Sequence, residues 1–535
     1  MPEKKGQNYM HGAAILTAGV VIMKILGAIY KIPIANIIGD DGYSMFIATY
    51  NVYNVFLTLA TAGLPVALSR LISEANAENR PVQATRTFEV AWKTFFAIGL
   101  VCSLIMFLFP RLIAEDILHN PDAAASIRTM SPSVLLVCLV SAYRGYCQGY
   151  GNMIPTTVGQ VLEVLVKVIA GLALAAIIVN AGGTKASGSA GAIFGVTAGS
   201  AAALIYMYMY KKKNYRDTVP AEPDIPDSDR RIFLRFIKIG VPIALGSSIL
   251  SLLNLVDSSI CMARLQSAAG LSLTEAQTLY GVYGKAQTLF NLPAAFITPM
   301  TISVVPAIAS ANARGENDEA TKISEDSMRV AAAVSMPMGA GLAVLSVPIM
   351  NIIFPRSHES GPALLAIMGA ASFFVCIVLM ENAILQASGK EKYTMYTMIA
   401  GGVVKIVTNY ILVGNPDINI YGAPVGTLVS YAVMAVANFV IMCYVLDKNP
   451  KVINILKGPA ISCAVMGILA WGSYTLLNSL TGPAGRFYVL LSMVIAMLIA
   501  VVTYVILAIR LRAVTAEDMK LIPGGSKIAK LLHMS

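Results

Sequence analysis

The sequence predicts an all-α polytopic membrane protein with 14 transmembrane helices, arranged as two six-helix lobes in a parallel pseudo-repeat plus two C-terminal helices. Three observations support this fold class. Hydrophobic residues make up 56% of the 535 residues and charged residues only 13%, whereas a soluble domain carries about 25% charged residues. Long apolar segments follow one another along the whole chain. Lys and Arg gather in alternate connections between these segments.

Fourteen segments contain the ~20 apolar residues that a helix needs to cross the hydrocarbon core of a bilayer. We expect spans over 9–37, 43–73, 87–113, 126–150, 155–180, 188–210, 232–263, 276–309, 324–353, 361–388, 392–414, 419–446, 454–478 and 485–509. Several of them contain proline, which kinks a helix and is tolerated where neighbouring helices satisfy the freed backbone groups.

The connections between these spans indicate the orientation of the chain. One side receives 23 Lys and Arg residues and the other side six. Cytoplasmic loops carry the excess of basic residues, so we expect the first side, with both termini, to be cytoplasmic. Most of the net charge of +10 lies in these loops. It therefore indicates a membrane surface, and we expect no nucleic acid partner.

A polar segment rich in proline and aspartate, 211–231, separates the sixth span from the seventh. We interpret 1–210 as an N-terminal lobe, 211–231 as a cytoplasmic linker and 232–446 as a C-terminal lobe. Residues 447–535 then form the last two spans and a cytoplasmic tail.

The two lobes repeat in sequence. A constant offset of 238 residues matches three pairs in the same order: Gln148 with Gln386, Gly151 with Gly389, and Lys167 with Lys405. Six spans per lobe, an even number, give both lobes the same orientation. This is a parallel repeat about an axis along the membrane normal, which is typical of transporters.

Basic residues within or at the edges of the spans are the candidate substrate-binding residues. They are Lys24, Lys31, Lys167, Lys285, Lys405, Arg70 and Arg144. A charge at the centre of a spanning helix costs roughly 2.5–3.5 kcal/mol, so the deeper lysines should face a bundle interior or an aqueous cavity. Lys24 and Lys31 lie two helical turns apart and share a face. Such a cationic interior attracts anions.

Three acidic residues lie at similar depth and are candidates for ion coupling or charge pairing: Glu163, Asp257 and Glu381. Glu163 stands four residues before Lys167, so these two side chains could simply pair. Lys24 could likewise pair with Asp257 or with Glu381 across the lobes. Both alternatives remain open from the sequence.

The chain contains no nucleotide-binding motif, no catalytic triad and no metal-ligand spacing of its seven Cys and four His residues. We therefore expect a protein that is not an enzyme and that holds no cofactor or metal. Transport would be driven by a coupling ion, the membrane potential or the gradient of the substrate.

Several short motifs in the N-terminal spans resemble a known family. They are Met23-Lys24-Ile25-Leu26-Gly27, Tyr30-Lys31-Ile32-Pro33, Ile38-Gly39-Asp40, Ala62-Gly63-Leu64-Pro65 and Ser69-Arg70-Leu71-Ile72. With them the chain resembles the polysaccharide-transport branch of the multidrug/oligosaccharidyl-lipid/polysaccharide (MOP) exporter superfamily. It is most similar to the MurJ-type lipid II flippases, especially their Gram-positive members related to stage V sporulation protein B.

The resemblance implies a flippase of the bacterial cytoplasmic membrane. Its substrate would be an anionic, lipid-linked saccharide carried on undecaprenyl pyrophosphate, above all lipid II. The protein would work by alternating access, as a monomer among membrane lipids. Lys24 and Lys285, the latter in Tyr283-Gly284-Lys285, hold the places of the family's pyrophosphate ligands, and the last two spans would line a groove for the lipid tail.

Two departures concern the ligand set. Where better-known Gram-negative members have an Arg in the middle of span 2, this chain has Val55-Phe56-Leu57. The second basic residue of their span 1 aligns near Tyr30 of this chain, and Lys31 follows one residue later.

Three other functions are weighed against lipid II transport. They are a flippase for another polyprenyl-linked glycan, a cation-coupled multidrug exporter, and a scaffold that docks wall-synthesis enzymes through the linker.

Overall fold

The computed structural model describes residues 9–215, 224–445, 452–481 and 485–511. All regular secondary structure in these residues is helical, which confirms the all-α fold class. Among them, 13 segments are long and apolar enough to cross a membrane. The first of these runs over Ile29–Ala77 and takes in part of the expected span 9–37 and all of 43–73. The expected total of 14 therefore stays a prediction.

The chain divides into two compact units. Unit 1 comprises Met1–Ala263 and Leu273–Gln277, and unit 2 comprises Arg264–Ser272 and Thr278–Ser535. The functional division into two lobes at the linker 211–231 stays a prediction.

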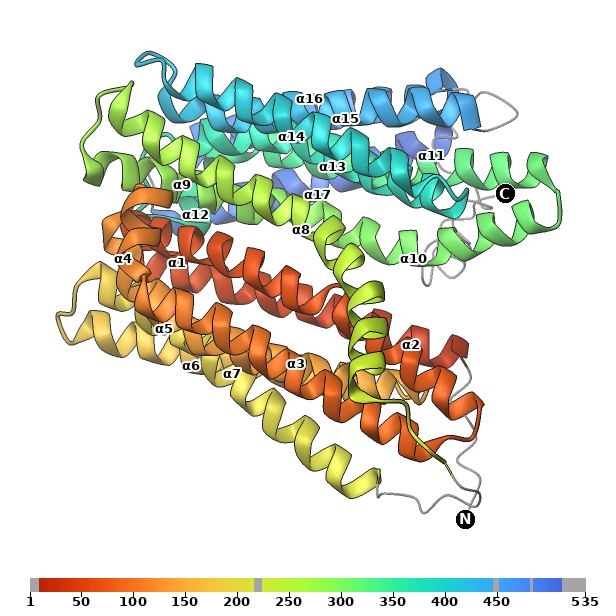
Figure 1. The fold of residues 1–535 in the computed structure, drawn as a ribbon. Helices are drawn as coiled ribbons and strands as arrows, with labels where there is room; N and C mark the ends of the chain where they lie inside the picture. The colour runs from red at the N-terminus through yellow and green to blue at the C-terminus, as the bar shows by residue number, and fades with distance from the viewer. Residues whose placement is uncertain (1–8, 216–223, 446–451, 482–484, 512–535) are drawn as a thin grey trace. The chain divides into compact units, whose positions relative to one another are not determined.

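Unit 1 is a bundle in which α6 packs along α7, α5 packs on both α3 and α7, and α1 contacts α5, α6 and α7 (Figure 1). Its helices are α1 (Tyr9–Thr61), α2 (Leu64–Ala77), α3 (Pro81–Leu108), α4 (Pro110–Leu112), η1 (Ile113–Ile117), η2 (Pro121–Ala123), α5 (Ala124–Gly149), α6 (Ile154–Asn180), α7 (Lys185–Asn214) and most of α8 (Asp229–Ser267).

The long helix α1 consists of two helices that meet at Gly39, where φ is 74° and ψ is −175°. This left-handed region favours glycine because a Cβ atom would clash there. Gly39 lies in the connection expected between spans 9–37 and 43–73. The second of these spans is not continuous, since α1 ends at Thr61 and α2 begins at Leu64. Pro65 stands in the first turn of α2, where its missing N–H leaves no bond unmade.

Glycines on α7 allow this helix to approach α6 closely. A Cβ atom built on Gly199 would lie 2.3 Å from the backbone oxygen of Glu163, and one on Gly195 would lie 2.6 Å from that of Lys167. Small residues of this kind allow membrane helices to pack backbone against backbone. The two charged residues of α6 are therefore held against α7 by its glycine face.

Unit 2 is a second bundle, in which α13 contacts α10, α11 and α15, and α14 packs on α15 (Figure 1). Its helices are most of α9 (Leu273–Phe290), α10 (Leu292–Ala313), α11 (Asn317–Val344), α12 (Ser346–Ile353), α13 (Gly361–Ala387), α14 (Glu391–Val413), η3 (Asn419–Tyr421), α15 (Gly422–Val445), α16 (Val452–Thr481) and α17 (Arg486–Arg510).

Two spans that the sequence predicts as continuous are each broken in unit 2. The expected span 276–309 divides at Asn291 into α9 and α10, and 324–353 divides at Leu345 into α11 and α12. Apolar composition alone predicts a crossing of the membrane and not the breaks within it. A local sign does mark the first break, because Pro293 stands in the opening turn of α10.

The two helices without a counterpart in the repeat, α16 and α17, pack on each other and on α11. The Tyr504 hydroxyl donates a hydrogen bond of 2.7 Å to the backbone oxygen of Ala333 on α11. A small apolar core joins the two helices: Met466, Ala470, Ala500, Tyr504 and Ala508.

Candidate functional site

A half-buried ion pair joins two helices of unit 1, and a third helix adds a hydrogen bond to it. Arg144 on α5 places Nη2 2.7 Å from Oε2 of Glu163 on α6, and the two side chains are 14% and 18% exposed. Ser200 on α7 donates a hydrogen bond of 3.2 Å to the other oxygen of Glu163. Both carboxylate oxygens are therefore engaged. Nε of Arg144 is buried and has no hydrogen-bond partner among the described residues.

Lys167 lies one turn along α6 from Glu163, yet the pair that their spacing allows does not form. No carboxylate of the described residues lies within 4.0 Å of its ammonium group. Instead Nζ lies 5.6 Å from the centre of the Tyr30 ring, and Tyr30 donates a hydrogen bond of 2.7 Å to the backbone oxygen of Ala192. The cation thus rests on an aromatic face, which is a weaker contact than an ion pair.

Lys31 is half-buried on α1, and its charge repels that of Lys167. It also forms no ion pair with any residue that the structure describes. Of the three basic side chains Lys31, Lys167 and Arg144 in unit 1, only Arg144 therefore pairs with the carboxylate of Glu163. Lys24 belongs to α1 as well, but its side chain lies outside the described part of the structure, so its role stays a prediction.

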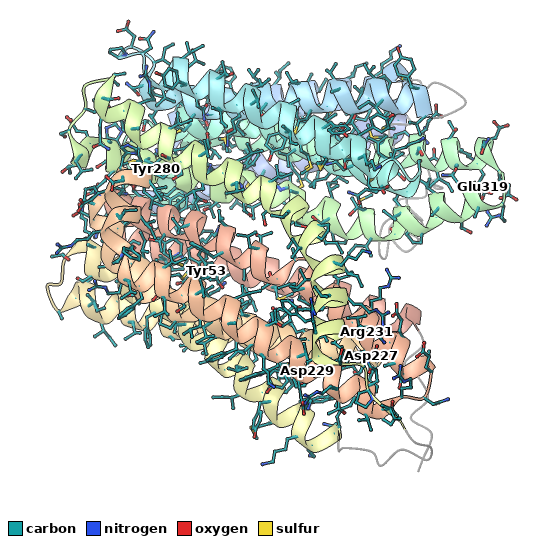
Figure 2. All side chains as sticks on the ribbon, in the orientation of Figure 1. Tyr53, Asp227, Asp229, Arg231, Tyr280 and Glu319 are labelled. Atoms are coloured by element: carbon teal, nitrogen blue, oxygen red, sulfur yellow. The ribbon has the colours of Figure 1, made fainter. Side chains whose placement is uncertain are left out.

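A series of aromatic side chains on α1 was missed by the sequence reasoning. The rings of Phe46 and Tyr50 are 4.7 Å apart, and those of Tyr50 and Tyr53 are 6.1 Å apart. Tyr53 (Figure 2) is buried, with 4% of its surface exposed. The spacing of these aromatic residues, three or four apart, was the available signal, since it places them on one helix face.

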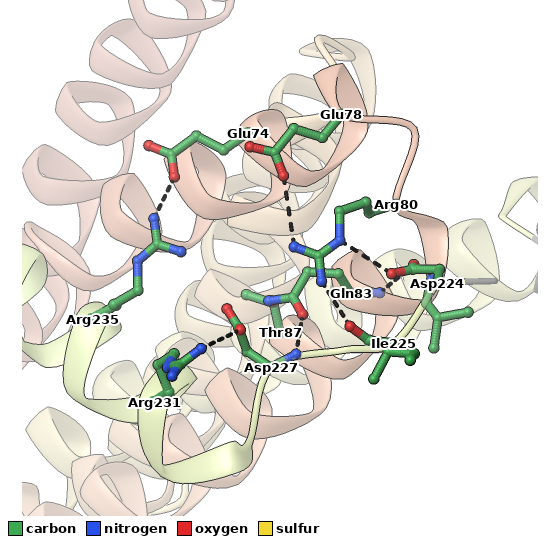
Figure 3. A network of polar contacts seen from close by, with 11 residues as sticks. Glu74, Glu78, Arg80, Gln83, Thr87, Asp224, Ile225, Asp227, Arg231 and Arg235 are labelled. Atoms are coloured by element: carbon green, nitrogen blue, oxygen red, sulfur yellow. Dashed lines mark hydrogen bonds and ion pairs between the residues drawn. The ribbon is translucent and has the colours of Figure 1, made fainter. Parts of the chain in front are cut away.

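Arg70 belongs to a different part of unit 1. Its side chain is 65% exposed, and Nε lies 3.0 Å from Oε1 of Glu74 on the same helix. The other oxygen of Glu74 lies 2.8 Å from Nη2 of Arg235 on α8. Glu74 and Arg235 belong to a polar network at the helix ends (Figure 3), and Arg70 contacts this network through Glu74.

The same network holds the end of the linker. The Asp224 carboxylate accepts hydrogen bonds from the backbone N–H groups of Val82 at 2.7 Å and Gln83 at 2.9 Å. Arg80 adds a bond from Nε at 3.2 Å, and the Asp224 side chain is only 3% exposed. These are the free donors at the start of α3, so Asp224 caps that helix although it lies over 140 residues away.

Unit 2 holds the other two candidate lysines. Lys285 on α9 is 1% exposed, and its Nζ lies 5.3 Å from the centre of the Phe354 ring. Lys405 is half-buried on α14. The expectation that Lys167 and Lys405 face one shared cavity stays a prediction.

A buried amide, that of Asn438, lies beside a buried carboxyl group in unit 2. Glu381 on α13 is 1% exposed, and its Oε2 has no hydrogen-bond partner among the described residues. Its neighbour Asn438 donates to Asn382 at 3.0 Å and accepts from Thr397 at 2.6 Å. The third candidate acid, Asp257 on α8, is 4% exposed. The amides were missed, although asparagine inside an apolar span is a visible signal.

Comparison with known proteins identifies the family of this chain. A family described as polysaccharide biosynthesis protein matches residues 9–312. The chain is similar to three proteins of Bacillus subtilis (strain 168). The uncharacterized membrane protein YabM is 27% identical over 527 residues, 98% of this chain and 96% of the relative. The lipid II flippase MurJ is 24% identical over 455 residues, covering 81% and 82%. Stage V sporulation protein B is 24% identical over 523 residues, covering 97% and 98%.

Two solved structures share the fold. The inward closed conformation of the lipid II flippase MurJ matches with a TM-score of 0.68 at 14% identity, over 93% of this chain and 99% of that one. An inward-facing MATE multidrug transporter of the MOP superfamily matches with 0.66 at 14% identity, over 81% and 98%. The lipid II flippase among these relatives and the two solved structures are transport proteins and not catalysts, as expected for this chain. The chain is a multi-pass membrane protein that belongs to the polysaccharide biosynthesis protein family and has the fold of the MOP transporters.

Proposed function

We propose that this protein flips a saccharide linked to undecaprenyl pyrophosphate across the bacterial cytoplasmic membrane, with lipid II as its first candidate substrate. The family and the similarity to a lipid II flippase over four-fifths of both chains support this substrate class. A polyprenyl pyrophosphate carries two adjacent anionic groups, and its transport requires cations inside the membrane that no protein carboxylate already neutralises.

The observation that carries the proposal is that no carboxylate of the described residues lies within 4.0 Å of the Lys167 ammonium group. Both oxygens of the Glu163 carboxylate already contact other side chains, those of Arg144 and Ser200. Lys167 is left with a π contact, next to the equally unpaired Lys31. Leaving such charges unpaired within a membrane is costly, so an anion or water must compensate them. A pyrophosphate suits two lysines, since each offers a compact charge with three donors.

We further infer that the transport cycle is an alternating access of 1–210 against 232–446 without nucleotide hydrolysis, by a monomer with both termini in the cytoplasm. Glu381 supports a role for a coupling ion. A carboxylate that is 1% exposed and has an unbonded oxygen is costly unless a proton or a cation neutralises it. Four further residues stay candidates for roles in the same transport cycle: Asp257, Lys24, Lys285 and Lys405.

Two other functions remain candidates. Another polyprenyl-linked glycan would use the same cationic group, and the family description, polysaccharide biosynthesis protein, supports this alternative as well. A cation-coupled multidrug exporter is supported by the MATE-like fold and by the buried Glu381. The excess of lysine over carboxylate in unit 1 favours an anionic substrate over a cationic drug.

The test is flipping in sealed vesicles that contain the purified protein and either lipid II or a second undecaprenyl-pyrophosphate glycan. The variant with Lys31→Gln and Lys167→Gln should fold and should lose most of its flipping. The matched control is Lys212→Gln, which removes an exposed lysine at the end of α7. A normal rate in the double variant would refute the role of the lysines. Gradient-driven drug transport without any flipping would refute the function. Depleting the protein in cells and identifying the accumulated precursor would then name the glycan.

A further inference from the structure

The first three turns of α8 carry a stripe of positive charge. At about 100° per residue, four cations fall within an arc of about 140° on one side of the helix: Arg230, Arg231, Arg235 and Lys238. The opposite side is buried in unit 1 through Ile232 and Phe236, and the Phe236 ring lies 5.9 Å from that of Phe95 on α3. The stripe itself is exposed, so it is a surface feature and not part of the core.

The stripe lines a shallow surface groove of about 320 Å³, formed by Ser228, Arg230, Arg231, Leu234, Arg235 and Lys238. Two of its cations are held in place: Arg231 lies 3.1 Å from Asp227, and Arg235 lies 2.8 Å from Glu74. Arg230 and Lys238 form no ion pair within 4.0 Å with any residue that the structure describes. The groove therefore has two positioned guanidinium groups and two further cations whose charge is not neutralised.

Hydrogen bonds and an ion pair hold the start of α8 against α3. Asp227 and Asp229 lie beside the start of α8 together with Arg231 (Figure 2). The Asp229 carboxylate is 2.6 Å from Nε of Arg86 on α3. The backbone N–H of Asp227 donates a bond of 2.6 Å to the side chain of Gln83 (Figure 3). With the Asp224 cap, these bonds attach the first turn of α8 to the start of α3.

The length of α8 places the stripe at the membrane boundary. Its 39 residues extend about 58 Å, at about 1.5 Å per residue, whereas the hydrocarbon core is about 30 Å thick. The charged residues lie in its first turns, and the next basic residue of the helix is Arg264, near its far end. Exposed Phe233 and Leu234 stand among the cations. Such a mixture of basic and apolar side chains is typical of the layer of lipid headgroups.

We propose that this groove binds the phosphate headgroup of an anionic membrane phospholipid. The phosphate would lie between Arg230 and Lys238, with the acyl chains beside Leu234. Arg and Lys are the side chains that bind phosphate, and basic residues next to a spanning helix attract anionic lipids. The site lies outside the lysine group of α1 and α6, so it does not depend on the proposed transport function.

The test is binding of phosphatidylglycerol and of phosphatidylcholine with matched acyl chains to the purified protein, measured by native mass spectrometry. The protein should prefer phosphatidylglycerol, and the double variant Arg230→Gln/Lys238→Gln should lower its affinity for this lipid about tenfold. The matched control, Lys212→Gln/Lys213→Gln, removes two exposed lysines at the end of α7 and should keep the preference. Should the double variant not fold, Lys238→Gln alone should give a smaller loss in the same direction.

Three results would overturn the proposal. One is an unchanged preference in the α8 variants. Another is an equal loss in the α7 control, which would indicate unspecific surface charge. The third is displacement of the lipid by millimolar inorganic pyrophosphate, which would indicate a site for a soluble phosphate. Normal flipping by the α8 double variant in vesicles of phosphatidylcholine would show that the lipid site and the transport site are separate.

Discussion

Gly151 and Gly389 lie 238 residues apart and adopt the same left-handed backbone, with φ values of 73° and 70°. In each case the glycine follows a helix, and its backbone N–H donates to the backbone oxygen of a glutamine three residues earlier: to Gln148 at 2.8 Å and to Gln386 at 3.0 Å. The backbone N–H of the residue after each glycine donates a second hydrogen bond, to a backbone oxygen further back in the same helix. The two units thus end α5 and α13 with one and the same turn, as the repeat in the sequence predicts.

These turns should be sensitive to substitution by alanine. Gly151→Ala and Gly389→Ala should each lower the free energy of unfolding by roughly 1–2 kcal/mol, because an L-residue is strained in the left-handed region. Gly246→Ala in α8 is the control, since its added Cβ meets no atom within 4 Å and alanine favours a helix. Thermal unfolding in detergent measures all three. A control as unstable as the two turn variants would contradict the explanation by backbone strain.

Removing one partner of the Arg144–Glu163 ion pair should lower the stability of the protein more than removing both. Arg144→Met leaves a half-buried carboxylate inside the bundle without its partner, and we expect a loss of roughly 3–5 kcal/mol in stability. The double variant Arg144→Met/Glu163→Met removes both charges and should recover most of that loss. Melting temperatures of the single and double variants decide this. Equal destabilisation in both would mean that packing, and not the stranded charge, is responsible.

Lys24 is expected to act on substrate and not on the fold. Lys24→Ala should leave insertion and stability intact while flipping is lost, and Lys24→Arg should keep part of the activity because the charge survives. A structural ion pair would give the opposite pattern, with a loss of roughly 3–5 kcal/mol on removal of one partner. Thermal stability and flipping, measured on both variants, separate the two roles. A stable Lys24→Ala protein that flips at the normal rate would end this assignment.

The orientation of the chain follows from its loop charges and can be tested by cysteine labelling. In a background without native cysteines, residues introduced at position 220 and at the C-terminus should react only with reagents that enter the cytoplasm. Cysteines at positions 184 and 482 should react from outside the cell. Labelling of position 220 from outside would disprove the expected topology.

Glu381 should couple transport to an ion. In sealed vesicles, flipping by the wild-type protein should respond to an imposed proton or sodium gradient without added ATP. Glu381→Gln should weaken that response, since the amide cannot take up a proton or balance a cation. Glu391→Gln, at the exposed start of α14, is the matched control. Strict dependence on ATP in purified vesicles would exclude this form of coupling.

The features that repeat locally were predictable from the sequence. A run of apolar residues long enough to cross the hydrocarbon core must form a helix there, because its backbone groups can pair only with one another. The turn at Gly151 and Gly389 was visible for a similar reason, since a glycine at a helix end serves a conformation that other residues avoid. The depth of Lys167 and Glu163 along α6 follows from counting residues within a span.

The partners of these charges were decided only by the tertiary structure. Sequence spacing favoured Lys167 for Glu163, but Arg144 and Ser200 reach the carboxylate from two other helices. The cap that Asp224 provides for α3 likewise joins residues more than 140 positions apart. A helical pattern specifies which side chains share a face and how deep they lie. Which helix stands opposite that face depends on how the whole bundle packs, and therefore on the glycines, breaks and crossings of every helix at once.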